Sequence, residues 1–599
     1  MTSTEAQFDV RSATVLRDLF KPEHLRRTIK RMRAWQESEN EVAHPLRQIL
    51  LVEYEDGLAE GLAASVAAGV WSPAPAYPVL VAKRSGTYRE LVYPCLVDTI
   101  VGRRVIDALE PHITKDDNDK VFFGRSHANA DRQRGDYENW FKVWLDFSAQ
   151  IGSALESDGF TYVFETDITQ FFPSVDRSRA KHALAQRTYA HQTLLELLFY
   201  CVESWCPRVR YCSVPGLPIE PNDVSRLIAH NYVKGVDEHF VDDQRLKYFR
   251  WVDDTVVFAA DERTAHDIKR QHHLALREMG LSPNASKTSI LKASEYAATR
   301  HPDFNHRINT VQTTKSESGL KSLVDEWYAK DVDATPSWDK VATRLYSTAR
   351  VLRTSLLRQR AIDDIVMHPN LLRAAVKYIR AFELDDNDVA RLFAFTGQTT
   401  TSIEAQIEIA RLLCDARIMG DAQSIVRSAT HHVLMDDVRL GSGYARALFL
   451  LCVHKYGDKD ARDKIRNALG IERLQDDQLR LHFLYVYYCR NELDEAVARA
   501  VRHIDTPDIA LLMRVCEDAR RGKLVKHAKC LAKCLSQRYQ KRSIEARYLP
   551  FLFAMLRAPG KEAENAAWLK KYASEEALNQ IDDAAIKTFL RDELRHATR

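Results

Sequence analysis

The sequence predicts an α+β domain followed by an all-α domain. Strand-like runs such as YPVLVA and TVVFAA occur only between about residues 75 and 293, mixed with helical stretches and Pro/Gly turns. From about residue 336 onward, almost every segment has the periodicity of an amphipathic helix. A chain of 599 residues is too long for one hydrophobic core, so we expect about three domains.

The change from mixed strand and helix patterns to helix patterns alone also sets the expected domain boundaries. Residues 1–75 are expected to be helical, and residues 76–293 to form the α+β domain. Residues 294–335 are polar and only weakly periodic, which indicates a connector or an irregular excursion. Residues 336–599 are expected to form the all-α domain.

Turn-like stretches recur within the helical half. They are centred on Gly420, Gly457, Asn491, Gly522 and Gly560, at intervals of about 31–38 residues. This spacing suits helix pairs that cannot bury their apolar faces alone and must stack on their neighbours. We therefore expect a HEAT-like or TPR-like solenoid over roughly residues 400–599, serving as a scaffold or interaction surface. An irregular helical bundle with coincidental spacing is the alternative.

Composition limits the function classes. Lys plus Arg (86) nearly balance Asp plus Glu (83), so a polyanion would need a local groove rather than an overall positive field. The ten cysteines include no CxxC pair, which favours reduced thiols. The start, MTSTEAQFDVRS, lacks the basic and apolar parts of a signal peptide, and the apolar runs are too short to span a bilayer. We expect a cytoplasmic protein with no membrane partner.

Two acidic positions carry the main chemical signal. Asp253 and Asp254 lie side by side in YFRWVDDTVVFA, between two apolar runs. A hairpin turn that happens to use Asp would explain them. Asp167, however, ends another probable buried strand, where a charge costs several kcal/mol unless it is solvated, paired or coordinated. If the hairpin lies beside that strand, three carboxylates converge with little sequence-local positive charge to neutralise them.

A cluster of carboxylates of this kind suits divalent cations. Two Mg²⁺ ions, with Mn²⁺ as an alternative, would neutralise it, because hard cations select oxygen ligands. Two metal ions a few ångströms apart clamp the attacking and leaving oxygens of an in-line phosphoryl displacement. The pattern therefore favours nucleotidyl transfer.

The order of the motifs resembles that of reverse transcriptases. DITQFF resembles palm motif A, GLPIEPNDVSRLIAHNYVKGVD motif B, WVDD the catalytic hairpin and MGLSPNASKTSIL motif D, while VAKRSGTYRELVYPCLVDTIVGRRV resembles the fingers. Each motif alone is weak, but five in the right order are a strong signal. The resemblance implies a right-hand polymerase palm and fingers over about residues 80–293, with residues 1–75 as a helical part of the fingers.

The resemblance also implies roles for individual residues. Asp167 and Asp253 would be metal ligands, helped by the carbonyl of Ile168, with Asp254 in a supporting position. Lys83 and Arg89 match the fingers cations that grip a triphosphate, although Lys83 also suits a solvated surface position. Lys287 matches the motif D lysine that protonates the leaving pyrophosphate. Pro218, in the motif B segment, would line the nucleotide site.

Phe172 occupies the position at which the family places a bulky aromatic ring under the sugar. Such a ring excludes a 2′-hydroxyl, so the implied substrates are dNTPs and the product is DNA. A core role is the competing interpretation, because Phe171 beside it is equally apolar.

Motif B departs from the usual Pro-Gln-Gly, since Pro218 is followed by Ile219 and Glu220, and later by Ser225 and Arg226. This variant, followed by a long helical domain, is similar to the abortive-infection (AbiK-like) and unknown-group reverse transcriptases of bacterial phage defence. That likeness implies template-independent synthesis, single-stranded DNA attached to a priming Tyr, and a homo-oligomer. Two alternatives stay open, namely a reverse transcriptase templated by a noncoding RNA and a helical-repeat interaction protein with a vestigial polymerase module.

Overall fold

The structure is a computed structural model that describes most of the chain. The described residues are 13–38, 50–51, 54–83, 87–114, 118–122, 140–188, 192–209, 212–213, 215–221, 223–398, 401–415, 422–437, 439–470, 474–495, 497–498, 507–523, 549–579 and 584–598. The chain folds into two compact units. Unit 1 comprises Met1–Ala43, Glu55–Tyr77 and Leu91–Pro302, and unit 2 comprises His44–Tyr54, Pro78–Glu90 and Asp303–Arg599.

A five-stranded sheet forms the centre of unit 1. Its strands, in spatial order, are β3 (Val121–Phe122), β7 (Leu246–Trp251), β8 (Asp254–Ala259), β4 (Tyr162–Thr166) and β9 (Ser289–Lys292). All neighbours are antiparallel except β3 and β7. In this register Thr166 pairs with Thr255, so the end of β4 lies beside the start of β8. The hairpin with the paired aspartates is therefore next to the strand that leads to Asp167, as the convergence of these carboxylates requires.

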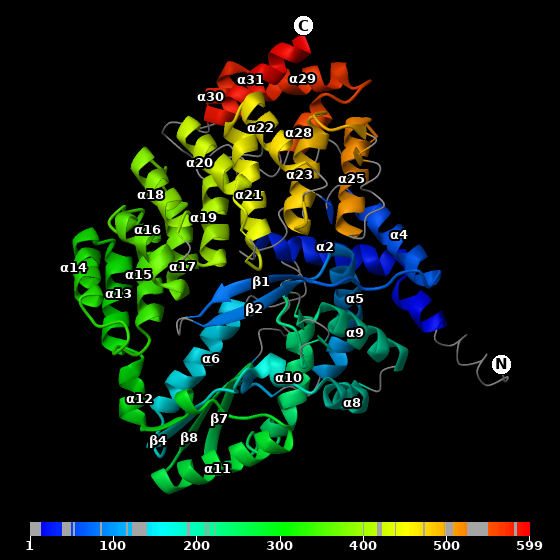
Figure 1. The fold of residues 1–599 in the computed structure, drawn as a ribbon. Coiled ribbons are helices and arrows are strands. Elements are labelled where there is room, and N and C mark those ends of the chain that lie inside the picture. The colour runs from blue at the N-terminus through cyan, green and yellow to red at the C-terminus, as the bar shows by residue number, and fades with distance from the viewer. Residues whose placement is uncertain are drawn as a thin grey trace, which may run out of the picture. The chain divides into compact units, whose positions relative to one another are not determined.

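Alternation along the strands gives the sheet two apolar faces. Val163 and Phe258 pair on one face, where they join a core cluster with Phe147 of α6 (Trp140–Leu155) and Tyr296 of α12 (Ala293–Thr299). Phe164 points to the other face, where its ring lies 5.7 Å from that of His272 in α11 (Glu262–Glu278). Helices thus cover both faces of the sheet (Figure 1).

The other helices of unit 1 surround motif B. Helix α10 packs against α5 and α8, and α5 and α8 each pack against α9. These elements and the remaining ones of the unit are α2 (Pro22–Ser38), α4 (Glu55–Ala67), α5 (Leu96–Ile113), α7 (Phe171–Ser174), α8 (Arg177–Thr188), α9 (Gln192–Trp205), β5 (Arg208–Val209), β6 (Cys212–Ser213), α10 (Val224–Asp237) and the 3₁₀ helix η1 (Ala285–Lys287).

A separate two-stranded sheet pairs β1 (Tyr77–Ala82) with β2 (Tyr88–Tyr93). Lys83 N donates to the carbonyl of Thr87 at 2.8 Å and closes this hairpin. Most of the hairpin belongs to unit 2. There, Val79 of β1 packs closely against Gly441, where an added Cβ would come within 3.2 Å of the valine side chain.

Residues 294–335, expected to be a connector or an irregular excursion, contain regular helix. Most of α12 lies in this range, followed by α13 (Pro302–Thr314) and α14 (Glu317–Tyr328). Phe304, Ile308 and Val311 recur on one side of α13 and are buried, so the helical period is present after all. The Ser316 hydroxyl caps α14 by accepting a hydrogen bond from Gly319 N at 3.0 Å.

The second half of the chain is helical throughout its described residues. Its elements are α15 (Trp338–Leu352), α16 (Arg358–Met367), η2 (Pro369–Leu371), α17 (Leu372–Ile379), α18 (Asp386–Thr396), α19 (Ile403–Asp415), α20 (Ala422–Leu434), α21 (Ser442–Tyr456), α22 (Lys459–Leu469), α23 (Asp477–Cys489), α25 (Pro507–Arg520), α28 (Leu549–Leu556), α29 (Glu562–Tyr572), α30 (Glu575–Asn579) and α31 (Ala584–Thr598).

The expected turns fall at helix ends. Gly457 follows α21, and Asn491, Gly522 and Gly560 follow α23, α25 and α28 with φ values of 57°, 66° and 75°. Gly420 lies outside the described residues. Helix α21 packs against both α19 and α23, and α23 packs against α25 and α28 (Figure 1). Successive helices therefore stack side by side, while the HEAT-like assignment stays a prediction.

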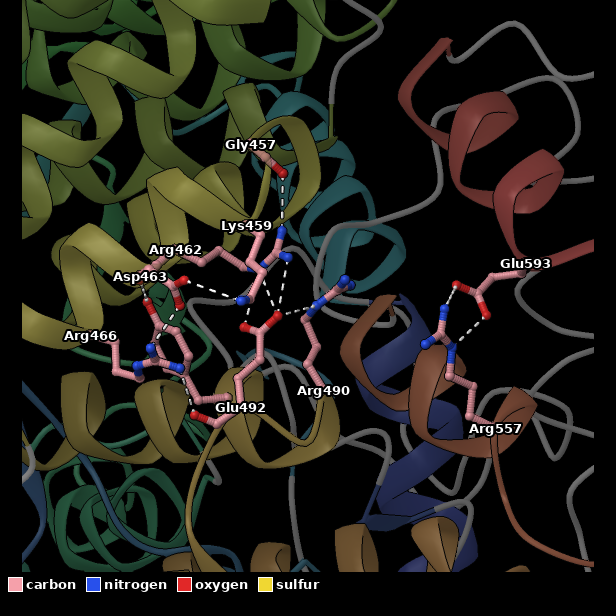
Figure 2. Close-up of polar contacts among 10 residues, drawn as sticks. Gly457, Lys459, Arg462, Asp463, Arg466, Arg490, Glu492, Arg557 and Glu593 are labelled. Carbon is pink, nitrogen blue, oxygen red and sulfur yellow. Dashed lines mark hydrogen bonds and ion pairs between the residues drawn. The ribbon is translucent and has the colours of Figure 1, made fainter. Parts of the chain in front are cut away.

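A buried polar network joins successive helices of this stack. Glu492 accepts hydrogen bonds from the guanidinium groups of Arg462 and Arg490, and its carbonyl accepts one from Arg466 (Figure 2). The side chains of Arg462 and Glu492 are only 7% and 11% exposed. One carboxylate is thus the shared counter-charge of two largely buried guanidinium groups.

The described residues are mostly helical with small sheets, and they contain both the mixed α/β part and the all-helical part that the sequence predicted. None of the described helices combines the length and apolar character needed to cross a bilayer. The three domain boundaries drawn from the sequence stay predictions.

Candidate active site

Asp167 directly follows β4, and the segment after α11 holds it in place. Its backbone carbonyl accepts a hydrogen bond from Asn284 N at 2.7 Å, and Ile168 forms a β-bridge with Pro283. Thr169 N donates to Ser282 O at 2.9 Å. These bonds continue the pairing past the end of β4. They hold the backbone that carries the buried Asp167 side chain.

Asp253 lies in the two-residue turn between β7 and β8. Trp251 pairs with Asp254 across this turn, which leaves Val252 and Asp253 as the connecting residues. Val252 has a φ of 55°, a left-handed conformation that a β-branched residue adopts at a cost of about 1–3 kcal/mol. A strained residue of this kind persists only where its surroundings fix it.

The turn brings Asp253 to Asp167. The two carboxyl groups lie within hydrogen-bonding reach, and burial, together with the charges of Asp254 and Asp167, raises the pKa of Asp253 to about 7. Like charges at this separation favour a shared proton or a bound cation. Asp254 itself is exposed at the first position of β8, so it acts on the pair through its charge.

Lys287 supplies a positive charge at the same place. Its ammonium group forms an ion pair with Oδ2 of Asp167 from the end of η1. Burial lowers the pKa of Lys287, but the hydrogen bond and charge of Asp167, with the charges of Asp254 and Asp253, raise it above the ordinary value overall. Lys287, which the resemblance assigns to the leaving pyrophosphate, thus lies beside the Asp167 carboxylate.

The carboxylate pair fits a divalent cation in one respect. Oδ1 of Asp167 is buried and accepts no hydrogen bond, which is costly for a carboxylate unless a cation or a proton satisfies it. The described residues, however, include no group of three His, Cys, Asp or Glu side chains arranged to hold a metal ion. Asp167 and Asp253 are thus a two-carboxylate site, and metal binding by them and by the Ile168 carbonyl stays a prediction.

Phe172 and Phe171 differ in their surroundings. Both lie in α7, but Phe171 is 4% exposed in the core, whereas Phe172 is only partly buried. The carbonyl of Phe172 accepts a hydrogen bond from Leu217 N at 2.8 Å. This bond ties the motif A helix to the motif B segment, and the Phe172 ring, unlike that of Phe171, is partly exposed.

A glycine makes the contact between motifs A and B possible. Gly216 has a φ of 94°, and a Cβ there would lie 2.1 Å from the carbonyl oxygen of Pro173. Only glycine fits this approach. Pro218 follows two residues later and is buried, so its predicted contact with a nucleotide stays untested.

Lys83 and Arg89 lie in the β1–β2 hairpin of unit 2. Lys83 is half-buried and Arg89 is exposed. Arg89 is close enough to Glu404 of α19 for its charge to oppose the rise of that carboxyl's pKa, which burial raises to about 7. Their predicted role in gripping a triphosphate stays a prediction.

Sequence reasoning missed the contacts made by Asn284 and Glu220. Nδ2 of Asn284 lies 3.4 Å from Oδ2 of Asp167, and Oε1 of Glu220 accepts a hydrogen bond from Ser225 N at 3.0 Å at the start of α10. Glu220 stands where motif B usually has the glycine of Pro-Gln-Gly. Here its side chain caps the start of α10. The only available signal for Asn284 was its place in SPNASK, a turn-forming stretch.

Among known proteins, solved telomerase structures are similar to this chain at low sequence identity. No protein-family model and no curated protein sequence matches the chain. Among solved structures, apo telomerase from Candida tropicalis is similar with 11% identity over 71% of this chain and 73% of that chain, at a TM-score of 0.29. Telomerase from Candida albicans, in complex with the TWJ fragment of telomeric RNA, is similar with 10% identity over 67% of this chain and 66% of that chain, at a TM-score of 0.28.

A form of the Candida tropicalis enzyme truncated from its C-terminal domain is 13% identical over 39% of this chain, at a TM-score of 0.27. The chain spans 54% of that structure's length. Similarity at this level carries no argument about function. What supports a function is the arrangement of Asp167, Asp253 and Lys287 itself.

Proposed function

We propose that this chain is a Mg²⁺-dependent nucleotidyltransferase of the reverse-transcriptase type, which adds dNTPs to a growing DNA strand. One observation carries the proposal. The end of β4 and the β7–β8 turn bring Asp167 and Asp253 within hydrogen-bonding reach, with a buried, unsatisfied oxygen on Asp167. A purely structural role gives no reason to pack two carboxyl groups together at this cost.

Each nearby side chain has a task in this chemistry. Asp167 and Asp253 would hold the divalent cations, which when bound supply Lewis-acid stabilisation of the phosphoryl group and of the attacking hydroxyl. Lys287 carries a proton within reach of these carboxylates and would donate it to the departing pyrophosphate. The partly buried Phe172 ring would exclude ribonucleotides by contact with a 2′-hydroxyl.

The finer assignment rests on the family resemblance. It comprises template-independent synthesis, single-stranded DNA attached to a Tyr, assembly into a homo-oligomer and a role in cytoplasmic antiphage defence. The near balance of 86 basic and 83 acidic side chains supports it weakly, because a processive enzyme on a long duplex normally needs an extended basic track.

The test is a nucleotide-incorporation assay on purified full-length protein with dNTPs and Mg²⁺ but no template. DNA that grows on the protein and resists denaturation supports protein-primed synthesis, and Asp253→Asn should abolish it. Incorporation that appears only after addition of a structured RNA favours the RNA-templated alternative. Phage protection that survives Asp253→Ala unchanged would favour the vestigial-module alternative and overturn the catalytic assignment.

A further inference from the structure

Arg250 is a fully buried arginine in β7, the strand that leads into the turn with Asp253. It lies in β7 with an exposed fraction of 0%. Its Nε and Nη2 atoms donate to the two carboxylate oxygens of Asp237 at 2.7 and 2.6 Å, which is the bidentate geometry that guanidinium groups favour. Asp237 is the last residue of α10, so the ion pair joins the motif B helix to the sheet.

The third side of the same guanidinium group contacts the turn itself. Nη1 of Arg250 donates to the carbonyl oxygen of Val252 at 2.6 Å. On the other side of that residue, Val252 N donates to the carbonyl of Phe122 at 3.0 Å. Both polar backbone groups of Val252 are therefore held, and the carbonyl that Arg250 grips belongs to the peptide bond leading into Asp253.

This arrangement explains how the strained backbone at Val252 persists. A left-handed valine relaxes unless several contacts oppose the change. The two hydrogen bonds on Val252 act at the peptide units on either side of its Cα, which are the units that would rotate. The bonds from Arg250 and to Phe122 therefore hold Val252 in its left-handed conformation.

The surroundings of Asp237 indicate a fixed anchor. The hydroxyl of Tyr248 donates to Oδ1 of Asp237 at 2.7 Å, which adds a third donor to this carboxylate. His230 lies 3.5 Å from Nη2 of Arg250, and burial lowers the pKa of the nearby His272 to about 4, which keeps that ring neutral. Of the side chains named here, Asp237 is the one that carries a negative charge, and it forms the ion pair with Arg250.

We propose that Arg250 is a positioning residue that fixes the Val252 carbonyl and thereby aims the Asp253 carboxylate at Asp167. This inference rests on the proposed nucleotidyltransferase function for its kinetic consequence. Its structural consequence, restraint of the turn, is independent of any activity. A buried ion pair that only stabilises the core is the competing explanation, and the two differ in what happens when the pair is replaced as a whole.

The decisive variant is the double substitution Arg250→Met with Asp237→Leu. Replacing both partners of a buried ion pair with apolar residues of similar size often preserves folding, whereas removing one partner leaves a buried charge. The double variant should keep the wild-type circular dichroism spectrum but lose the bond to Val252. Tyr248→Phe is the matched control, because it removes one hydrogen bond from Asp237 and leaves the Val252 contact in place.

Two readouts separate positioning from general stability. Hydrogen exchange of peptides covering residues 246–259 should accelerate at least tenfold in the double variant, with no change in peptides from α19–α23, and should stay within twofold of wild type in Tyr248→Phe. The kcat for nucleotide incorporation should fall at least tenfold, while the KM for dNTP stays within about threefold, because the change affects the geometry of the chemical step.

The outcomes are distinguishable. A folded double variant with wild-type exchange at the turn and wild-type kcat overturns the proposal. Faster exchange with unchanged kcat overturns the catalytic part, since the turn is then held by Arg250 without consequence for chemistry. If wild-type protein incorporates no nucleotide, the proposed function fails, and the exchange measurement still decides whether Arg250 holds the turn.

Discussion

The ammonium group of Lys287 forms an ion pair with Asp167, a buried carboxylate that the chain brings to it from 120 residues earlier. The lysine side chain is 61% exposed, while that of Asp167 is 7% exposed. Lys287 thus reaches the carboxylate from the solvent side, where a nucleotide's phosphates would also arrive.

The first prediction concerns this lysine. Lys287→Met should lower kcat for nucleotide incorporation by about 10²-fold or more, because loss of a general acid typically costs that much. Lys287→Arg keeps the charge but is a weaker acid than lysine, so it should remain close to the Met variant. Steady-state kinetics check this, with Lys292→Met, an exposed β9 residue, as the control. Full activity of Lys287→Arg would restrict Lys287 to an electrostatic role.

The second prediction concerns stability and pH. Burial and neighbouring charges raise the pKa of Asp253 to about 7, whereas an unfolded Asp titrates near ~3.9. Between these pH values the folded state binds more protons, so this residue makes the unfolding free energy fall as pH rises from about 4 to about 7. In EDTA at pH 8, Asp253→Asn should unfold about 2 °C or more above wild type.

The comparison at lower pH supplies the control. The difference in unfolding temperature between Asp253→Asn and wild type should become smaller as the pH is lowered toward 5, since the wild-type carboxyl is then protonated. A thermal scan at both pH values measures the difference. Equal midpoints of wild type and variant at pH 8 would contradict a close Asp167–Asp253 pair.

The third prediction concerns metal binding. Because cations bind deprotonated carboxylates, adding MgCl₂ or MnCl₂ should raise the wild-type unfolding midpoint more at pH 8 than at pH 6. Asp253→Asn and Asp167→Asn should show little of this shift. If the carboxamide variants respond to the metal as wild type does, the ion binds elsewhere.

The fourth prediction concerns sugar selection. Phe172→Val should admit ribonucleotides and reduce the preference for dNTPs by about tenfold or more, equivalent to about 1.4 kcal/mol of discrimination. The ring lies beside Phe171, with centroids 5.3 Å apart, so Phe171→Leu is the matched control. That control should lower stability without changing the preference. An unchanged preference in Phe172→Val would assign Phe172 to packing.

The fifth prediction concerns the helical half. Glu492→Gln removes the carboxylate that neutralises Arg462 and Arg490, and it should lower the unfolding free energy by about 3–5 kcal/mol because two guanidinium groups lose their shared counter-charge. Glu495→Gln, which changes an exposed carboxylate paired with Arg520, should cost about 0–1 kcal/mol. Chemical denaturation of both variants measures the contrast. Equal effects would mean that solvent screens the Glu492 network.

The residues that sequence could locate are those marked by local patterns. Asp253 and Asp167 were found because apolar runs reveal buried strands, and a charge at a strand end then stands out. Asn284, Arg250 and Asp237 were missed because their roles arise from contacts between different elements of the fold, which leave no local pattern in the sequence. The helices within residues 294–335 were missed because their apolar positions, such as Phe304 and Ile308, are sparse among polar neighbours.

The discontinuous make-up of the two units has a consequence for biosynthesis. The segment Pro78–Glu90 emerges from the ribosome early, but the other residues of its unit begin only at Asp303 and continue to Arg599, apart from the short stretch His44–Tyr54. The nascent β1–β2 hairpin must therefore wait for more than two hundred further residues before most of its unit exists. During that interval the side chain of Val79, which is buried in the finished protein, lacks its contact with Gly441. A chain stalled near residue 302 should accordingly depend on chaperones more than the finished protein does.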